Sequence, residues 1–249
     1  MQKSQVSNER GSGSPNISAV ILDYGKVLAR CPTPEEFGRM AKMFNVDFES
    51  FYKLWEASRG SYDRDDFTAE EYWLKMAAKT NTSLDGRQIE TLRKVEVEIW
   101  TYMNPGMLDW VSRLRAGGIK TGLLSNMPWD LVNHLRTNGQ WMGNFDFKTF
   151  SAEVRLIKPA PGIYQHTLDG LAISAPEALF IDDRENNILA AHALGMHAIQ
   201  FQSIGQLKHD LEALGFPILP AGVESSSAEL PVASTADRPD REGKFSPLL

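Results

Sequence analysis

Three short apolar segments, each followed at once by a polar residue, constrain the fold of this chain more than any other feature. They are Ile17–Leu22 before Asp23, Lys120–Leu124 before Ser125, and Ala178–Ile181 before Asp182. Short apolar runs bounded by polar or turn residues are typical of strands buried on both faces of a parallel sheet. Ligands of such sheets bind at the carboxyl ends of the strands. We therefore expect the three polar residues to meet at one edge of the sheet.

Helical segments separate these predicted strands. Met107–Ala116 and Asn186–Leu194 carry apolar residues at helical spacing, and each is followed by a glycine, a common stop signal. A fourth apolar run, Ala198–Phe201, follows the second of these helices. Alternating strands and helices predict an α/β fold with a Rossmann-like, doubly wound parallel sheet that helices cover on both faces.

The segment between the first two predicted strands differs from the rest of the chain. Residues 31–104 contain no convincing strand. Four stretches have the pattern of helices: Pro34–Phe44, Phe48–Ser58, Thr68–Thr80 and Asp85–Tyr102. Thr68 and Glu71 have the spacing of a capping box at the start of the third helix. We interpret residues 31–104 as an all-helical cap inserted into a core made of residues 17–30 and 105–220.

The two ends and the composition narrow the class of protein. Residues 1–16 and 221–249 are rich in small, polar and charged residues, so we expect disordered tails. The net charge is −6 and no basic block appears, which argues against nucleic acid as a partner. No signal peptide is visible, nor any stretch near the roughly 18 apolar residues of a membrane span, so we expect a soluble cytoplasmic protein. The single cysteine, Cys31, excludes an internal disulfide.

The polar residues at the strand ends share one chemistry. Each alone has an ordinary explanation as a turn or cap residue. Two adjacent acids, Asp182 and Asp183, are unfavourable at a sheet edge unless a cation compensates their charge. With Asp23, Ser125 and Lys158 they form a coherent set. In it a carboxylate attacks phosphorus, a hydroxyl and an ammonium hold the phosphoryl oxygens, and the acids bind Mg²⁺.

Four segments, ILDYGKVL, LLSNM, VRLIKPAPGIY and FIDDRENNILAAHALG, resemble in order the signature segments of the haloacid dehalogenase (HAD) superfamily. The stretch GSYDRDDFTAEEYW resembles the cap of the subgroup that includes sugar-phosphate phosphatases and the amino-terminal phosphatase domain of soluble epoxide hydrolases. The resemblance covers about residues 17–202. It implies a Mg²⁺-dependent hydrolase of phosphoric monoesters that acts on small phosphorylated metabolites.

The resemblance also assigns roles in catalysis and phosphate binding. It implies that Asp23 is the nucleophile and forms an aspartyl-phosphate. Ser125 and Lys158 match the residues of the family that contact the phosphate and assist the reaction, and Asn126 lies beside Ser125 as a further substrate-binding residue.

The metal ligands are assigned in the same way. The resemblance implies that Asp23, the carbonyl of Gly25, Asp182 and Asp183 hold Mg²⁺. It further implies that Asp183 binds the ion directly and that Asp182 acts more through water. Asn187 matches the asparagine that orients the fourth segment in the family.

The chain departs from the family at two positions. Many phosphatases of the family have a second Asp two residues after the nucleophile, which acts as general acid and base, and this chain has Gly25 there. Such help contributes roughly 10²–10⁴-fold in rate. We therefore expect a slow enzyme, a preference for good leaving groups, or another group in this role. Lys26 stands where the family usually has Gly or a small polar residue. It either helps to hold an anion or points away, and we favour the second interpretation.

Two arginines are further candidates for substrate binding. Arg59 and Arg64 lie on a segment that we interpret as a cap loop facing the core, and a solvated loop is the alternative. The pattern of the cap does not identify the substrate, and the oligomeric state stays open.

Two other functions compete with a phosphatase. In a 2-haloacid dehalogenase the same Asp23 displaces halide from carbon without a metal. Dehalogenases of the family commonly have an aromatic residue at the position of Gly25, and they lack an acid pair such as Asp182–Asp183. A non-catalytic or very slow binding or regulatory protein is supported by Gly25 and Lys26 alone. A scaffold has no physical need for clustered carboxylates.

Overall fold

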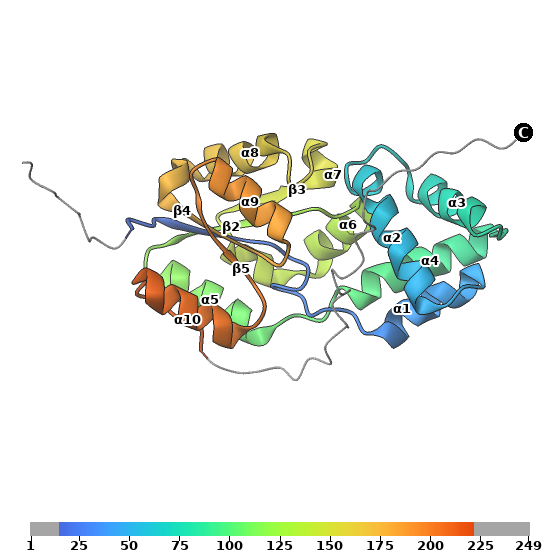
Figure 1. The fold of residues 1–249 in the computed structure, drawn as a ribbon, viewed down its shortest axis with the longest axis horizontal. Helices are drawn as coiled ribbons and strands as arrows, with labels where there is room; N and C mark the ends of the chain where they lie inside the picture. The colour runs from blue at the N-terminus through green and yellow to red at the C-terminus, as the bar shows by residue number, and fades with distance from the viewer. Residues whose placement is uncertain (1–14, 222–249) are drawn as a thin grey trace, which may run out of the picture.

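The computed structural model describes residues 15–221, and a five-stranded sheet forms its centre (Figure 1). The order is β3-β2-β1-β4-β5, and all neighbouring strands are parallel. The strands are β1 (Ala19–Leu22), β2 (Lys120–Ser125), β3 (Phe147–Phe150), β4 (Ala178–Asp182) and β5 (His197–Gln200). The predicted doubly wound α/β core is confirmed.

The central strand β1 shows why the sheet needs two layers of helices. None of its four side chains has exposed surface. Ala19 and Ile21 pack into one apolar cluster, and Val20 and Leu22 pack into another on the opposite face, as expected of alternating side chains. Such a strand is stable only when both faces are covered.

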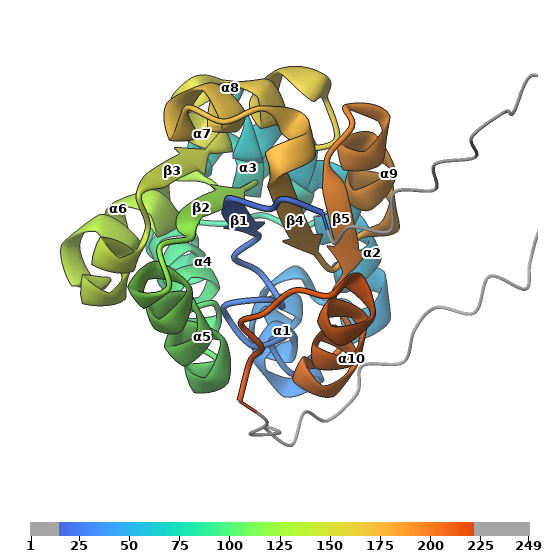
Figure 2. The ribbon, with the colours of Figure 1, turned by 90° about the vertical axis from the view of Figure 1, so that its left-hand side faces the viewer.

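Helices supply both covers (Figure 2). On the face of Ile21 lie α8 (Pro161–Leu171) and α9 (Glu185–Ala193). On the face of Leu22 lie α5 (Pro105–Ala116), α6 (Trp129–Asn138) and α10 (Ile204–Leu214). The remaining short elements of the core are η2 (Gln140–Asn144), α7 (Ser151–Val154) and η3 (Ala175–Glu177).

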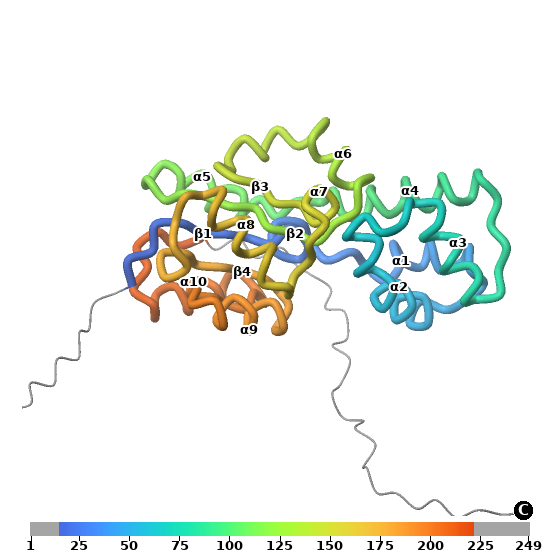
Figure 3. Tube along the Cα trace, turned by 90° about the horizontal axis from the view of Figure 1, so that it is seen from above, coloured from blue at the N-terminus to red at the C-terminus, as the bar shows by residue number. Residues whose placement is uncertain are grey.

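The segment between β1 and α5 forms a helical layer at the end toward which β1 runs (Figures 1 and 3). It consists of α1 (Pro34–Ala41), η1 (Lys42–Phe44), α2 (Phe48–Asp63), α3 (Ala69–Lys79) and α4 (Gly86–Ile99). These helices have their own apolar core, in which Phe37, Phe51 and Trp73 are fully buried. The inserted all-helical segment is present, and Thr68 and Glu71 form the predicted capping box of α3.

The topology places the functional candidates at one point. The strand order reverses between β1 and β4, since the chain continues to β2 on one side of β1 and to β4 on the other. In open α/β sheets, ligands bind at the carboxyl ends of the strands beside such a switch point. Asp23 follows β1 directly, and Asp182 is the last residue of β4.

Some sequence expectations fall outside this description. The predicted tails, residues 1–16 and 221–249, lie outside the described residues except for positions 15, 16 and 221. The division into a core (17–30 and 105–220) and a cap (31–104) stays a prediction, and its limits fall just before α1 and α5. Within residues 15–221, no helix has the length and apolar character needed to span a membrane.

Two glycines in helix interiors test the packing between α8 and the edge strand β3. A Cβ on Gly170 of α8 would lie 2.2 Å from the ring of Phe147, whereas a Cβ on Gly38 of α1 would meet no heavy atom within 4 Å. Alanine favours a helix over glycine by about 1 kcal/mol. We expect Gly38→Ala to raise the free energy of unfolding by about 0.5–1 kcal/mol. Gly170→Ala is expected to lower it by about 1–3 kcal/mol. Urea denaturation measures both, and equal stabilisation by the two changes would contradict the packing described.

Candidate active site

A buried lysine joins the two carboxylates at the strand ends. Nζ of Lys158 lies 2.8 Å from Oδ1 of Asp23 and 2.6 Å from Oδ2 of Asp182. It also donates to the carbonyl of Leu124, at 3.0 Å. Three acceptors therefore surround an ammonium that has three protons to donate. Because Lys158 and both aspartates are buried, the ion pairs are shielded from solvent.

The carboxylate of Asp182 is saturated with hydrogen bonds. Besides Lys158, it accepts from the backbone N–H of Arg184 at 2.8 Å and from Nδ2 of Asn187 at 2.9 Å to each oxygen. Asp182 has no exposed surface. This arrangement suits a residue that orients Lys158 and the β4–α9 loop, and it leaves little capacity for direct contact with an ion. Asn187 therefore holds this loop, as expected.

Asp23 keeps one oxygen available. Its Oδ1 accepts from Lys158 and from the backbone N–H of Tyr24 at 2.7 Å, while Oδ2 accepts no hydrogen bond from residues 15–221. Burial raises the pKa of Asp23 to about 6; Lys158 opposes this rise, and Asp182 and Asp183 add to it. A carboxylate held at one oxygen and open at the other has the geometry of a nucleophile.

Ser125 and Asn126 follow β2 at the same edge. Asn126 donates to the carbonyl of Lys158 and accepts from its N–H, both at 2.9 Å, so it fixes the loop that carries the lysine. Its side chain is thus engaged with the backbone. The hydroxyl of Ser125 has no hydrogen-bond partner within residues 15–221, although the residue is buried. It is the group of this pair that is free to contact an anion.

The donor set fits a hard divalent cation. Single carboxylate oxygens of Asp23, Asp182 and Asp183 lie within 4.8 Å of one another. Oxygen ligands are those that Mg²⁺ prefers. Because Asp182 is saturated, Asp23 and Asp183 have more capacity than Asp182 to contact an ion directly, and the metal roles of these three residues stay a prediction.

Gly25 lies against an aromatic ring of the cap. A Cβ at this position would be 3.3 Å from the ring of Trp100, which follows α4 directly. The indole therefore occupies the space next to the position where related phosphatases carry their acid. The sequence shows the missing acid, but the contact with Trp100 spans 75 positions and has no local signal.

Lys26 points toward the site, contrary to the interpretation that we favoured from the sequence. Its Nζ lies 3.3 Å from Oδ2 of Asp183. Burial lowers the pKa of Lys26, but the neighbouring Asp183 and other groups outweigh this effect and raise it. The sequence contained one signal for this contact: an unusual lysine follows the predicted nucleophile, and an acid pair lies at the end of another predicted strand.

The two cap arginines have other partners. Arg59 lies within α2 and not on a loop, because the helix continues to Asp63, and Arg64 follows directly in the turn after it. Arg59 is paired with Asp63 at 2.7 Å and with Glu96, inside the cap. Arg64 is paired with Asp66 and is partly exposed. Their predicted role in substrate binding has no support in these contacts, since the charge of each is already compensated.

Contacts between cap and core were not foreseen. Arg184, which follows the acid pair, reaches Glu56 of α2 at 3.1 Å. Ser151 donates to the carbonyl of Asp63 at 2.6 Å and accepts from the N–H of Met127. The sequence carries no pattern that pairs these residues, because they are distant along the chain.

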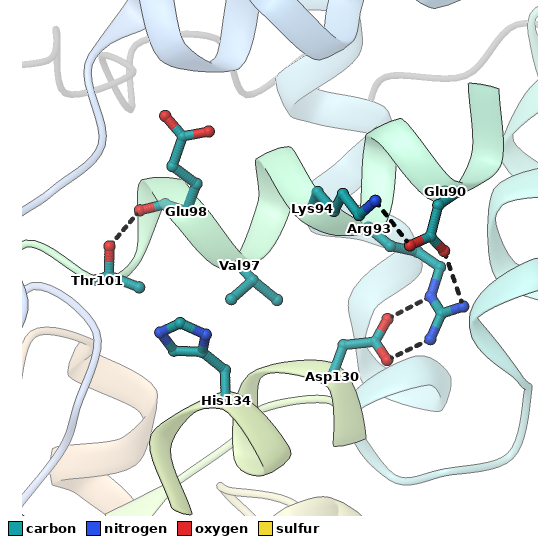
Figure 4. Close-up of a pocket in the computed structure, with 8 residues that line it drawn as sticks. All are labelled: Glu90, Arg93, Lys94, Val97, Glu98, Thr101, Asp130 and His134. Carbon is teal, nitrogen blue, oxygen red and sulfur yellow. Dashed lines mark hydrogen bonds and ion pairs between the residues drawn. The ribbon is translucent and has the colours of Figure 1, made fainter. Parts of the chain in front are cut away.

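A groove between α4 and α6 belongs to the same interface (Figure 4). Arg93 of α4 donates two hydrogen bonds of 2.7 Å to the carboxylate of Asp130 on α6. Val97 and His134 also line the groove. None of the predicted site residues does, so the groove marks contact between cap and core and lies apart from the carboxylate cluster.

Comparison with known proteins identifies a family that covers both the core and the inserted helical segment. The model of the haloacid dehalogenase-like hydrolases matches residues 5–195. The chain belongs to this family. The resemblance of its four segments is confirmed, and the chain is a hydrolase by family.

Two relatives show the range of proteins that share this hydrolase domain. Acyl-CoA dehydrogenase family member 10 of Mus musculus is 30% identical over 229 residues, 83% of this chain and 20% of that protein. Phosphoglycolate phosphatase of Yersinia pseudotuberculosis is 28% identical over 133 residues, 53% of this chain and 55% of that enzyme. The HAD-like chain thus spans a fifth to about half the length of these relatives.

Solved structures show the same fold. A HAD family enzyme from Bacteroides thetaiotaomicron has a TM-score of 0.62 and 21% identity, covering 75% of this chain and 94% of that one. The same enzyme was also solved in complex with magnesium and inorganic phosphate. An L-2-haloacid dehalogenase has a TM-score of 0.61 and 22% identity, covering 76% and 88%. Fold similarity alone therefore does not separate a phosphatase from a dehalogenase.

Because Arg59 is paired with buried carboxylates, we expect its replacement to lower the free energy of unfolding. Arg59→Met leaves the buried carboxylates of Glu96 and Asp63 without their cation. Removing one partner of a buried ion pair costs about 3–5 kcal/mol. We expect a loss of this size in chemical denaturation. Arg64→Met, at the exposed end of the same helix, should change the stability by less than about 0.5 kcal/mol. A raised KM with unchanged stability in Arg59→Met would instead restore the role in substrate binding.

Proposed function

We propose that this HAD-like hydrolase is a Mg²⁺-dependent phosphatase of small phosphorylated metabolites, with Asp23 as nucleophile. The observation that carries the proposal is the buried Lys158, which is shared by Asp23 and Asp182, with Asp183 close by. One oxygen of the nucleophile stays open, and carboxylate oxygens of Asp23 and Asp183 lie within 4.8 Å of each other. This is the arrangement that transfer of a dianionic phosphoryl group needs.

The proposed reaction has two halves. Oδ2 of Asp23 attacks phosphorus, the bond between phosphorus and the leaving oxygen breaks, and that oxygen takes a proton from solvent. Water then attacks the phosphorus of the aspartyl-phosphate, which releases inorganic phosphate and restores Asp23. Lys158 offsets negative charge on Asp23, and the Ser125 hydroxyl donates to a phosphoryl oxygen. A bound Mg²⁺ would supply charge that stabilises the phosphoryl oxygens.

The comparisons support this reaction over dehalogenation. Two relatives by sequence are phosphatases: a phosphoglycolate phosphatase and a sesquiterpene phosphatase. The similarity to a dehalogenase concerns the fold. Displacement of halide by a carboxylate has no use for a cation, so the proximity of Asp183 to Asp23 favours phosphoryl transfer. Small phosphorylated molecules are therefore the proposed substrates.

The nucleophile can be tested with p-nitrophenyl phosphate, whose leaving group needs little protonation. We expect release that requires Mg²⁺, is lost with a chelator and falls to background in Asp23→Asn. Asp169→Asn, on the exposed side of α8, is the matched control and should keep full activity. Activity that persists in Asp23→Asn would exclude the proposed route. Chloride release from 2-chloropropionate without metal would point to the dehalogenase.

The absence of an acid at Gly25 predicts how the rate depends on the leaving group. Across aryl and alkyl phosphates, kcat/KM should fall steeply as the pKa of the leaving alcohol rises. Gly25→Asp should flatten this dependence and raise the rate of the poorest leaving group by up to about 10²–10⁴-fold, provided that Trp100 shifts aside. Gly25→Asn has nearly the same size and no acid, so it should keep the steep slope. A shallow slope in the wild type would show that another group already donates the proton.

A further inference from the structure

Lys26 occupies a backbone position that disfavours a lysine. Its φ is 61°, in the left-handed region, whereas the φ of the preceding Gly25 is not positive. The glycine therefore stands where the backbone accepts any residue, and the lysine stands where glycine would avoid strain. A strained residue beside a nucleophile is a reason to look for a functional contact.

The side chain makes such a contact. Nζ of Lys26 lies 3.3 Å from Oδ2 of Asp183, and the two side chains are 32% and 16% exposed. Against the opposing effect of burial, the charge of Asp183 raises the pKa of Lys26, so the ammonium stays charged beside this carboxylate. Lys26 thus lies between the nucleophile turn and the acidic loop.

The ion pair involves the carboxylate that is best placed to bind a metal. Asp182 is saturated by Lys158, Asn187 and the N–H of Arg184, so Asp183 is the acid of this loop with capacity for an ion. That capacity is shared with Lys26. The guanidinium of Arg184 is also close enough to Asp183 to be stabilised by its charge, but its direct ion pair is with Glu56, at 3.1 Å. Lys26 is the cation that contacts the carboxylate of Asp183 within residues 15–221.

We propose that Lys26 is a built-in counter-ion of Asp183 that competes with Mg²⁺ and so weakens the affinity of the site for the metal. The inference rests on the proposed function for the identity of the metal. A cation that binds Asp183 must either displace the ammonium or share the carboxylate with it, and two cations on one carboxylate repel each other. Lys26 is therefore a positioning residue, which acts on the metal ligand and does not itself react.

The test is titration calorimetry of the full chain with MgCl₂ at constant pH, without substrate. Lys26→Met removes the charge at similar length, and Lys26→Arg keeps it. Lys53→Met removes one lysine from the exposed surface of α2 and controls for the change in net charge. We expect Lys26→Met to bind Mg²⁺ about three- to fivefold more tightly than the wild type, the upper part of the range of a partly exposed ion pair. Lys26→Arg and Lys53→Met should stay within about twofold of the wild type.

The outcomes separate this inference from the proposed function. Thermal unfolding first shows that Lys26→Met and the wild type are both folded. If they then bind Mg²⁺ with equal affinity, the proposed role of Lys26 is wrong, and the proposed function is unaffected. The same gain in Lys53→Met or in Lys26→Arg would also overturn it, because net charge or side-chain shape would then be the cause. If no variant binds Mg²⁺, the metal of the proposed function is wrong as well. Turnover of p-nitrophenyl phosphate that does not depend on Mg²⁺ would show independently that the proposed metal is wrong.

Discussion

The buried ammonium of Lys158 is the interaction on which the rest of the site depends. It binds Asp23 after β1, Asp182 at the end of β4 and the carbonyl of Leu124 in β2, and so ties three neighbouring strands together. Two buried carboxylates at a sheet edge would repel each other and lose their hydration without a cation between them. One lysine satisfies both, which allows the strand ends to carry their acids at a position closed to solvent.

The buried charges of the cap are paired with one another within the cap. Arg59, Asp63 and Glu96 form a buried cluster within the cap. Contacts to the core include ion pairs at the surface, such as Arg155 with Asp65 and Arg184 with Glu56, besides the buried hydrogen bond from Ser151 to the carbonyl of Asp63. Exposed pairs of this kind each contribute little free energy.

The sequence predicted those parts of the molecule in which local pattern and burial agree. β1, β2 and β4 are apolar on both faces, so their positions and the residues at their ends follow from composition alone. The edge strand β3 was missed, because Phe147–Phe150 has only four residues and its two apolar residues flank two polar ones. Arg59 was assigned to a loop because the predicted helix ended at Ser58, yet α2 continues to Asp63. Tertiary contacts override weak local preferences in such segments.

The contacts that distinguish this site from the general pattern of the family are long-range and electrostatic. Gly25 removes a carboxylate next to the nucleophile, and Lys26 adds an ammonium one residue later, so two neighbouring positions shift the local charge in the same direction. The ring of Trp100 lies beside Gly25, and Asp183 lies beside Lys26. Both neighbours come from other parts of the chain, which is why the two positions look like unrelated oddities in the sequence. In the folded protein both positions change the charge of the same site. Each makes the site less attractive to a cation and more attractive to an anion.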